Sequence, residues 1–396
     1  MNGHGEQYDM LIAGAGMVGA TLACALGERG LRIALLDARC PDLQWPAEGY
    51  DIRVSAITRA SQILLQRLAV WPFIEEQRLA PYREMEVWDA SGDGRVHFDS
   101  ADLGEPDLGH IIENRVILKA LHRRLAQLET VSLLCPAQMQ ALTFADDEAR
   151  VELADGRQLR GRLMVGADGG RSWVRRQAGI GIHGWEYDQS ALVTWVKTEK
   201  PHRETAWQRF QPDGPLAFLP LDDAHHSSIV WSTSHAHADA LKAMEETAFA
   251  EELAGSFAHR LGAIEQVGPR AVFPLRYFET LHYVQPRLAL VGDAAHMMHP
   301  LAGQGVNLGM ADAASLAEVL LQARERRQDI GSQPVLRRYE RWRRADNRLM
   351  LFSMDAFKLI FSSRSQALRW LRNTGLNLTD RLPPLKQAFM WRALGQ

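Results

Sequence analysis

Three glycine-and-acid signatures, each preceded by a run of aliphatic residues, constrain this chain more than any other feature. They are Gly14-Ala15-Gly16-Met17-Val18-Gly19, Gly166-Ala167-Asp168-Gly169 and Gly292-Asp293-Ala294-Ala295-His296. Each pattern predicts a buried strand that ends in a tight, polar turn, and open α/β folds bind ligands at such strand ends. A dinucleotide presents pyrophosphate, ribose and ring, and three separated turns could hold these three parts. We therefore interpret the chain as built around one large cofactor, FAD.

The first signature has the detail of a dinucleotide-binding strand–helix–strand unit. Gly14 permits the tight turn, Gly16 lets the backbone approach a pyrophosphate, and Gly19 lets the next helix pack against the strand. A second aliphatic strand ends at Asp37, whose carboxylate can accept hydrogen bonds from both ribose hydroxyls and would repel a 2′-phosphate. Strand, glycines, helix, strand and acid in register favour a nucleotide site over a chance glycine-rich turn.

The two later signatures place a carboxylate just past a buried strand. Asp293 can accept a hydrogen bond from a cofactor hydroxyl, and Asp168 stands at the equivalent point of its own strand. The loop 300–307 then opens a long helix, whose free N–H groups and partial positive charge would favour an anionic reduced flavin. A plain turn into a helix capped by the Asp remains the alternative for both acids.

Composition excludes several classes of protein. The chain has 396 residues, 46% of them hydrophobic, and a net charge of −3, which argues against a general nucleic-acid binder. Three cysteines without CxxC spacing indicate a reducing compartment and neither a disulfide framework nor a zinc site. Histidines 225, 226, 235 and 237 lack partners at metal-binding spacing, so we expect solvated side chains and no metal. No secretory signal or run of about 18 apolar residues is visible, so we expect a cytoplasmic protein.

The predicted fold class is α/β, with a discontinuous Rossmann-like FAD-binding domain, an inserted β-rich substrate domain and a C-terminal helical tail. Alternating strands from 190 to 234 and a hairpin within 85–98 indicate the β-rich part. A helix should begin after Asn114, a plausible N-cap. The predicted ranges are 1–80, 99–182 and 280–333 for the FAD-binding domain, 81–98 and 183–279 for the substrate domain, and 334–396 for the tail.

With Ser172 and Arg175 after the second signature, and Pro300, Gly303-Gln304-Gly305 and Asn307 after the third, the chain resembles the single-component FAD-dependent aromatic hydroxylases. Within them it resembles the ubiquinone-biosynthesis hydroxylases, and the resemblance covers nearly the whole chain. Stretches 108–114, 228–232 and 329–331 favour the enzymes that act on 2-octaprenylphenol. Stretches 205–208 and 283–286 keep open a sister hydroxylase that acts on a later methoxy-benzoquinol. The family often has Glu where this chain has Asp37, which alters only the reach to the ribose.

The resemblance implies a role for each matching residue. Arg53 and Asn114 should contact FAD near its pyrophosphate and ribitol, with Asp293 on the ribityl and pyrophosphate side. The Asp168-Gly169 turn is associated with FAD and with NAD(P)H as a transient reductant. The catalytic positions are expected to be Pro300, Gly303 and Gly305, whose backbone should flank the flavin ring and the substrate. The expected cofactor-binding residues are Gly14, Gly16, Gly19, Asp37, Arg53, Asn114, Asp168, Gly169, Asp293, Gly305 and Asn307.

The implied reaction inserts one atom of O₂ into the ring of a polyprenylated phenol through a flavin C4a-hydroperoxide. No side-chain base is expected, and His296 and His299 are interpreted as capping or packing residues. A flavin reductase or oxidase without oxygenation is an alternative enzyme. A flavin-stabilised assembly subunit of a quinone-biosynthesis complex is an alternative of another class.

The tail from 334 to 396 differs in charge from the rest of the chain. It holds thirteen Lys and Arg against four acids, interleaved with Trp and Phe. One interpretation is an amphipathic surface for anionic lipid headgroups or a partner protein, which would place the protein at the inner face of a membrane. The other is a helix packed on the FAD-binding domain, with arginines that extend to the solvent. Both interpretations stay open, for different helices.

Overall fold

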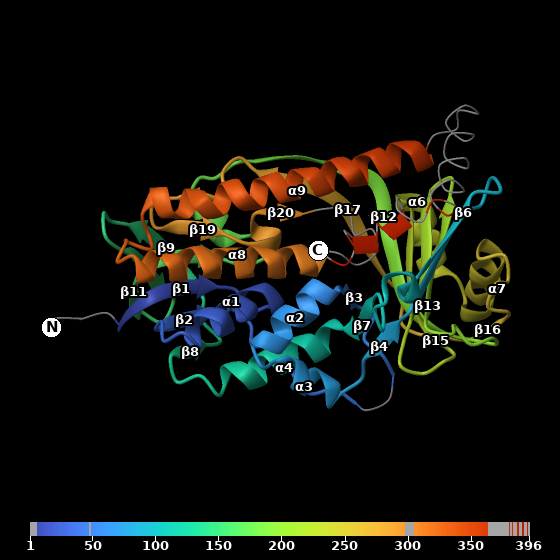
Figure 1. Ribbon diagram of the computed structural model, residues 1–396, viewed down its shortest axis with the longest axis horizontal. Helices are drawn as coiled ribbons and strands as arrows, with labels where there is room; N and C mark the ends of the chain where they lie inside the picture. Colours follow the sequence, from blue (N-terminus) through green and yellow to red (C-terminus); the bar gives the residue numbers. More distant parts are fainter. Residues whose placement is uncertain are drawn as a thin grey trace.

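The computed structural model describes residues 6–46, 49–297 and 305–362, of which 349–362 are described as backbone only. Seven residues nearer the C-terminus are also described, namely 380, 382, 386, 387, 390, 391 and 394. Two large sheets lie side by side along the longest axis, with α8 (Gly305–Glu325) and α9 (Gln333–Ser362) running along the first (Figure 1). Pro300, Gly303 and His299 fall outside the described residues.

The first sheet has a parallel centre, as expected for strands that are buried on both faces. Its strand order is β18-β19-β11-β1-β2-β8, and a hairpin of β9 and β10 extends from β11. The strands are β1 (Glu6–Ala13), β2 (Ile33–Leu36), β8 (Val131–Leu134), β9 (Met139–Phe144), β10 (Ala149–Leu153), β11 (Gln158–Gly166), β18 (Val284–Gln285) and β19 (Leu288–Leu290).

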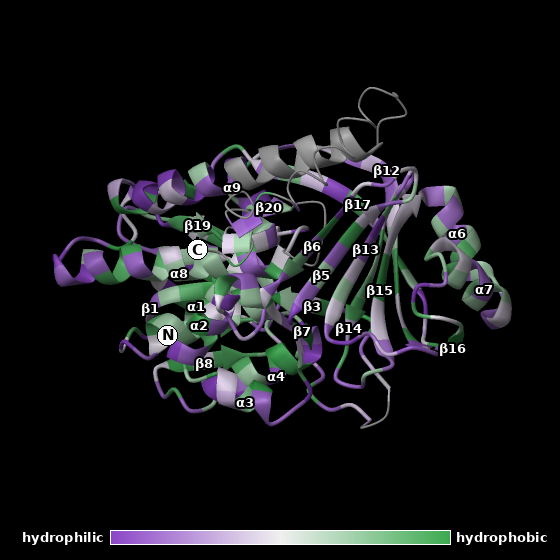
Figure 2. Ribbon diagram, turned by 45° about the vertical axis from the view of Figure 1, so that its right-hand side comes forward, coloured by the Kyte–Doolittle hydropathy of each residue, from purple (hydrophilic) through white to green (hydrophobic). Residues whose placement is uncertain are grey.

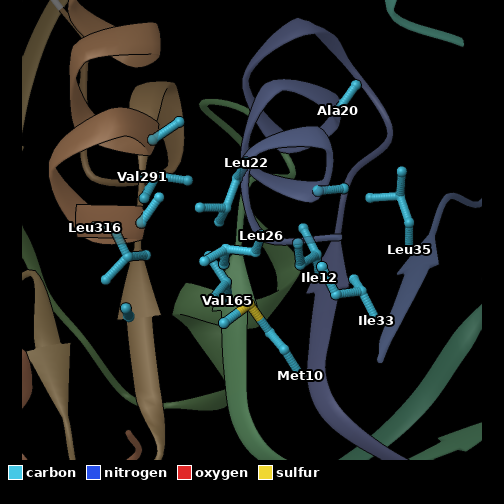
Figure 3. Close-up of a cluster of buried hydrophobic side chains, with 14 of the residues drawn as sticks. Met10, Ile12, Ala20, Leu22, Leu26, Ile33, Leu35, Val165, Val291 and Leu316 are labelled. Carbon is cyan, nitrogen blue, oxygen red and sulfur yellow. The ribbon is translucent and has the colours of Figure 1, made fainter. Parts of the chain in front are cut away.

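Helices cover the first sheet and close its core. Figure 3 shows Leu22 and Leu26 of α1 (Met17–Gly27) and Leu316 of α8 beside Ile12 and Val165 of the sheet. All five side chains are fully buried, and each contributes about 1.5–3 kcal/mol by leaving water. The remaining helices of this part are α2 (Arg59–Arg67), α3 (Trp71–Glu75), α4 (Asn114–Leu125) and α5 (Trp173–Gln177).

The second sheet is mainly antiparallel. Its order is β20-β17-β12-β15-β14-β13-β5-β6, with β16 paired to β12. Its elements are β5 (Glu84–Asp89), β6 (Arg95–Asp99), β12 (Ile182–Thr198), β13 (Thr205–Gln211), β14 (Gly214–Pro220), β15 (His226–Ser234), β16 (Ile264–Val267), β17 (Ala271–Thr280) and β20 (His296–Met297), with helices α6 (His235–Ala243) and α7 (Glu246–Ser256).

The two faces of the second sheet have different coverings. On the outer face, large side chains such as Phe218 and Trp231 pack with Leu241 of α6 and Phe249 of α7. Figure 2 shows α6 and α7 on the side away from the first sheet. A small sheet of β3 (Val54–Ile57), β7 (Gly109–Glu113) and β4 (Ala80–Tyr82) lies on the inner side, and its Ile111 packs with Leu219.

The α/β class predicted from the sequence is confirmed, whereas the predicted domain ranges stay predictions. The predicted cap of α4 is wrong by one residue, because Asn114 is the first residue of the helix and Glu113 is its N-cap. In the tail, Lys386 pairs with Asp102 (Nζ–Oδ2 2.7 Å), and Met390 and Leu394 are buried, so this part packs on the body. None of the helices in the described ranges is long and apolar enough to cross a membrane.

Candidate functional site

Strand register brings the three signature turns to one edge of the first sheet. Ala13 at the end of β1 pairs with Leu36 of β2 and with Gly166 of β11, and Gly166 pairs with Leu290 of β19. The four strands are parallel, so the turns that follow them leave side by side from their carboxyl ends. Backbone bonds tie the turns together, since Ala167 N–H donates to Ala13 O and Val291 N–H donates to Gly166 O.

The first turn is built by close backbone packing. Gly14 has φ +100°, and a Cβ there would overlap the Ala167 carbonyl. A Cβ on Gly19 would likewise overlap the Gly14 carbonyl, so α1 can pack this close to the strand only with glycine at position 19. Gly16 is different, because no described atom lies within 4 Å of where its Cβ would be. The first turn of α1 carries no acid, and no described side chain caps it, so its N–H groups are available to an anion.

Two side chains hold the backbone of Ala15 in this turn. Ala15 N–H donates to Asp37 Oδ2 (2.8 Å), and the ring nitrogen Nε2 of buried His122 donates to the Ala15 carbonyl (2.9 Å). Arg39 N–H donates to the second oxygen of Asp37 (3.0 Å), so this acid shapes the loop that carries it. His122 was not found from the sequence, because it lies on α4, more than a hundred residues away.

The second turn places Asp168 at the start of α5. Its Oδ2 accepts from Trp173 N–H (2.6 Å) and Val174 N–H (3.1 Å) in the first turn of α5, whose N-cap residue is Ser172. Its Oδ1 is buried and has no hydrogen-bond partner among the described residues. A buried acceptor of this kind is unusual in a folded chain and is free to receive a donor from a ligand. Gly169 follows with φ +76° and open space around its Cβ position.

Arg175 links the second turn to the third. Its guanidinium donates to the Gly170 carbonyl (2.8 Å) and to the Ala294 carbonyl (2.9 Å), and it lies over the ring of Phe278. The side chain is buried, and desolvation lowers its pKa. One arginine thus fixes the spacing of two turns that are more than a hundred residues apart in the sequence.

In the third turn, Asp293 is exposed but closely surrounded by protein. Burial of its carboxyl group among protein atoms raises its pKa, while the positive charges of His296 and Arg53 act in the opposite direction. The Arg53 guanidinium also lies 5.9 Å from the centre of the Phe273 ring, on β17. Arg53 therefore stands between the third turn and the second sheet.

The other predicted residues surround this edge with their side chains partly engaged. Asn114 accepts from Ser55 Oγ (2.6 Å), and its N–H donates to the Arg53 carbonyl (2.9 Å). Asn307 donates to the Ala56 carbonyl (2.7 Å) and accepts from Thr58 N–H (3.2 Å), which ties α8 to the end of β3. Gly305 begins α8 and has no described atom near its Cβ position.

The inner face of the second sheet presents apolar side chains next to this edge. Tyr187, Ala191, Leu275 and Tyr277 form one cluster there. Phe273, on the same face of β17, is 40% exposed beside Arg53. A partly exposed aromatic ring on an otherwise packed face can receive an aromatic ligand.

The four histidines 225, 226, 235 and 237, which lie at or just before the start of β15 and on α6, are exposed or half-buried, and each also makes a polar contact within the protein. His235 Nδ1 lies 2.7 Å from Ser190 Oγ, and His237 Nδ1 lies 2.9 Å from Thr233 Oγ1. His225 and His226 contact the Thr198 carbonyl and Asp223, respectively. Within the described ranges, no group of three His, Cys, Asp or Glu side chains could hold a metal ion.

Together these features fit a dinucleotide such as FAD. The open space above Gly16 and the uncapped start of α1 suit a pyrophosphate, and Asp37 follows the next strand, where a ribose would lie. The unpartnered Oδ1 of Asp168 and the exposed carboxylate of Asp293 add acceptors at the same edge. At the start of α1, where no described side chain caps the helix, backbone N–H groups and the helix dipole would contact the pyrophosphate.

Known proteins extend this assignment. The family described as FAD binding domain matches residues 7–351. The 3-demethoxyubiquinol 3-hydroxylase of Escherichia coli (strain K12) is 42% identical over 98% of this chain and 99% of its own length. Ubiquinone hydroxylase UbiL of Rhodospirillum rubrum is 41% identical over 98% and 89%, respectively.

A solved structure supports the fold alone. The p-nitrophenol 4-monooxygenase PnpA from Pseudomonas putida DLL-E4 superposes with a TM-score of 0.81 at 18% identity, covering 98% of both chains. The predicted cofactor FAD and the predicted monooxygenase class are confirmed by these matches. The chain therefore belongs to the FAD-dependent monooxygenases, in the family of the ubiquinone-biosynthesis hydroxylases, and is an oxidoreductase.

Proposed function

We propose that this protein hydroxylates the ring of a polyprenylated methoxy-benzoquinol of the 3-demethoxyubiquinol type during ubiquinone biosynthesis. The observation that supports this choice most is the 42% identity, over nearly both full lengths, to an enzyme named 3-demethoxyubiquinol 3-hydroxylase. The sequence stretches that favoured 2-octaprenylphenol leave that earlier phenol as the second candidate. The two substrates share a polyprenyl chain and an electron-rich ring, so the same site chemistry serves either.

The residues at the carboxyl edge would hold FAD by its polar parts. The N–H groups at the start of α1 would receive the pyrophosphate above Gly16, and Asp37 would accept from a ribose hydroxyl. Asp293 and Arg53 would contact the ribityl and pyrophosphate side, with Asn114 behind Arg53. When bound, FAD supplies the two-electron chemistry and the activation of O₂, with NAD(P)H as the proposed reductant.

The substrate ring would lie between this edge and the inner face of the second sheet. Phe273 offers an exposed aromatic surface there, and Leu275 and Ala191 continue an apolar floor suited to a prenylated ring. An apolar floor excludes water, so that the activated oxygen reacts with the substrate ring and not with solvent. Because the substrate is already electron-rich, positioning by Phe273 and by backbone groups of the 300–305 loop is proposed to suffice without a side-chain base.

Complementation distinguishes the two candidate substrates. The chain is expressed in Escherichia coli lacking the 3-demethoxyubiquinol 3-hydroxylase, and in a strain lacking the 2-octaprenylphenol hydroxylase, and the quinones are extracted. We expect ubiquinone to return in the first strain only. Recovery in the second strain alone would reverse the order of the candidates, and recovery in neither would reject both.

Labelled oxygen tests the reaction type. The purified protein is given FAD, NADH, ¹⁸O₂ and a short-chain demethoxyubiquinol, and the product is examined by mass spectrometry. Incorporation of one ¹⁸O atom into the ring is expected. NADH oxidation without label in the ring would instead indicate a reductase or oxidase. In the strain test, an assembly subunit would still restore ubiquinone with a flavin-site variant such as Gly16→Glu, once circular dichroism has shown that the variant is folded.

A further inference from the structure

Asp312 is a buried acid in contact with the third turn, and neither the proposed FAD contacts nor the proposed substrate face uses it. It lies midway along α8 and is completely buried. Its Oδ2 accepts from Gly292 N–H (2.9 Å) and from His296 Nε2 (2.6 Å). These two donors stand at the start and the end of the turn whose exposed acid is Asp293. A single carboxylate therefore accepts hydrogen bonds from both ends of that turn.

The other oxygen of Asp312 is held from a third element. Arg343 of α9 donates from Nε to Asp312 Oδ1 (2.7 Å) and is itself buried. The rest of its guanidinium is satisfied by Asp346 (3.0 Å) and by Asn347 Oδ1 (2.9 Å). The orientation of Asp312 thus depends on where α9 lies against α8.

Further hydrogen bonds connect α9 to β17 of the second sheet. Asn347 is fully buried and donates to Tyr283 Oη (3.3 Å), which in turn donates to Glu279 at the end of β17 (3.2 Å). The pairs connect the third turn, α8, α9 and the strand that carries Phe273.

Stability alone is a poor reason for such an arrangement. Withdrawing an ion pair from water is costly, and well-packed apolar side chains of similar size are often as stable or more stable. What a charged carboxylate adds is direction, because charge-assisted hydrogen bonds are short and strongly oriented. Here that direction acts on Gly292 N–H and His296, and so on the backbone that carries Asp293.

We infer that Asp312 and Arg343 are positioning residues for FAD binding, which hold the Gly292–His296 turn so that Asp293 meets the cofactor. The inference rests on the proposed role of Asp293. It assigns no contact with FAD to Asp312 or Arg343, which act through the turn. It also makes α9 part of the cofactor site, although α9 is distant from the site in sequence.

The test is a double-mutant cycle on FAD affinity. Apoprotein is titrated with FAD, and flavin fluorescence quenching gives the dissociation constant for the parent chain and for Asp312→Asn, Asp293→Asn and the double variant. Asp312→Asn should weaken binding by about tenfold in the parent chain. In the Asp293→Asn background the same change should weaken it less than twofold, because the turn no longer presents the acid that needs placing.

Matched variants guard against a folding defect. Asp346→Asn removes another acid that touches Arg343 but leaves Asp312 alone, so FAD affinity should stay within about twofold of the parent. If Asp312→Asn does not fold, as judged by circular dichroism, Arg343→Lys replaces it in the cycle with the same expectation. An equal loss in both backgrounds, or unchanged FAD affinity in Asp312→Asn, would overturn the inference.

These outcomes are separate from those of the proposed function. FAD affinity is measured without substrate, so the cycle can succeed even if the strain tests identify another quinone precursor. Failure of the parent chain to bind FAD would instead remove the proposed function together with this inference. Hydroxylation by a parent chain whose cycle is additive would remove the inference only.

Discussion

The turn after β1 and the turn after β19 leave the same edge of one sheet, yet they are held by different physics. Close backbone packing fixes the first, where Gly14 has no room for a Cβ and where Asp37 and His122 bind the N–H and the carbonyl of Ala15. The turn after β19, which is the third turn, is fixed by the buried carboxylate of Asp312 on α8 and by the buried Arg343 on α9. The first turn is therefore shaped mainly by close steric contacts, and the turn after β19 by buried charges from α8 and α9.

The difference has consequences for how each turn responds to change. Steric packing does not depend on pH, and a single extra carbon disrupts it. A buried ion pair depends on pH, and removing one partner leaves an unpaired charge. Comparing substitutions in the two turns therefore separates the two kinds of support.

The largest effect is expected at Gly14. Gly14→Ala must place its Cβ against the Ala167 carbonyl at a positive φ, so we expect it to destabilise the apoprotein by roughly 4 kcal/mol or more. Gly16→Ala, two residues on, meets no described atom and should cost no more than about 1 kcal/mol while weakening FAD binding. Urea unfolding of the two apoproteins measures the contrast. Equal stabilities would show that the first turn is not sterically fixed.

The next effect is expected at Arg343. Arg343→Leu leaves Asp312 buried without its arginine partner, although Gly292 N–H and His296 still contact it, so the chain should lose about 3 kcal/mol of unfolding free energy at pH 7. The pKa of Asp312 is lowered from its ordinary 3.8, despite desolvation, by His296 and Arg343. In the parent chain, this ionised carboxylate stabilises the fold above pH 3.8, and that contribution is lost as pH falls through the lowered folded value.

The pH dependence of Arg343→Leu gives the sharper check. Without the arginine, protonating Asp312 relieves the unpaired charge, so the deficit relative to the parent should shrink from pH 8 to pH 5. Urea titrations at both values measure it. The loss at Gly14 should not vary with pH over this range. A deficit in Arg343→Leu that is the same at both values would mean that the charge of Asp312 does not support the third turn.

The same contrast explains what the sequence could and could not predict. The Gly14–Gly19 pattern and the alternating strands act over short ranges, so the parallel sheet, the hairpins and the shared edge followed from local rules. The cap of α4 was misplaced at Asn114 because helix ends are set by only one or two residues.

The residues of the site that the sequence did not reveal share a different property. His122, Asp312 and Arg343 each act through a contact across the fold, and nothing near them in sequence marks their roles. Asp312 is surrounded by alanines in an ordinary helical pattern, and Arg343 is one of thirteen basic residues in the tail. Composition suggested that the tail arginines face lipid or solvent, whereas this one is buried against α8.

A smaller effect is expected at Asp37, where structural and cofactor roles can be separated. Asp37→Asn weakens the bond from Ala15 N–H, so it should cost about 1 kcal/mol and reduce FAD affinity. Asp9→Asn is the matched control, because Asp9 accepts from Arg32 N–H (2.8 Å) at the opposite end of the same strand pair. Its stability cost should be similar and its FAD affinity unchanged. Fluorescence titration and thermal melting report both, and an equal loss of affinity in Asp9→Asn would contradict a local role for Asp37.

The smallest effect on stability, with the opposite sign, is expected at Asp293. Desolvation raises the folded pKa of this acid, so its ionised form is disfavoured by folding, and above that pKa the charge lowers the stability of the apoprotein. Asp293→Asn should therefore leave the apoprotein slightly more stable at pH 7, a gain that disappears below pH 3.8, where the acid is protonated in both states. FAD binding should nevertheless weaken in the variant. Urea unfolding at pH 7 and FAD titration measure both quantities, and a less stable apoprotein would show that Asp293 supports the turn instead of being presented by it.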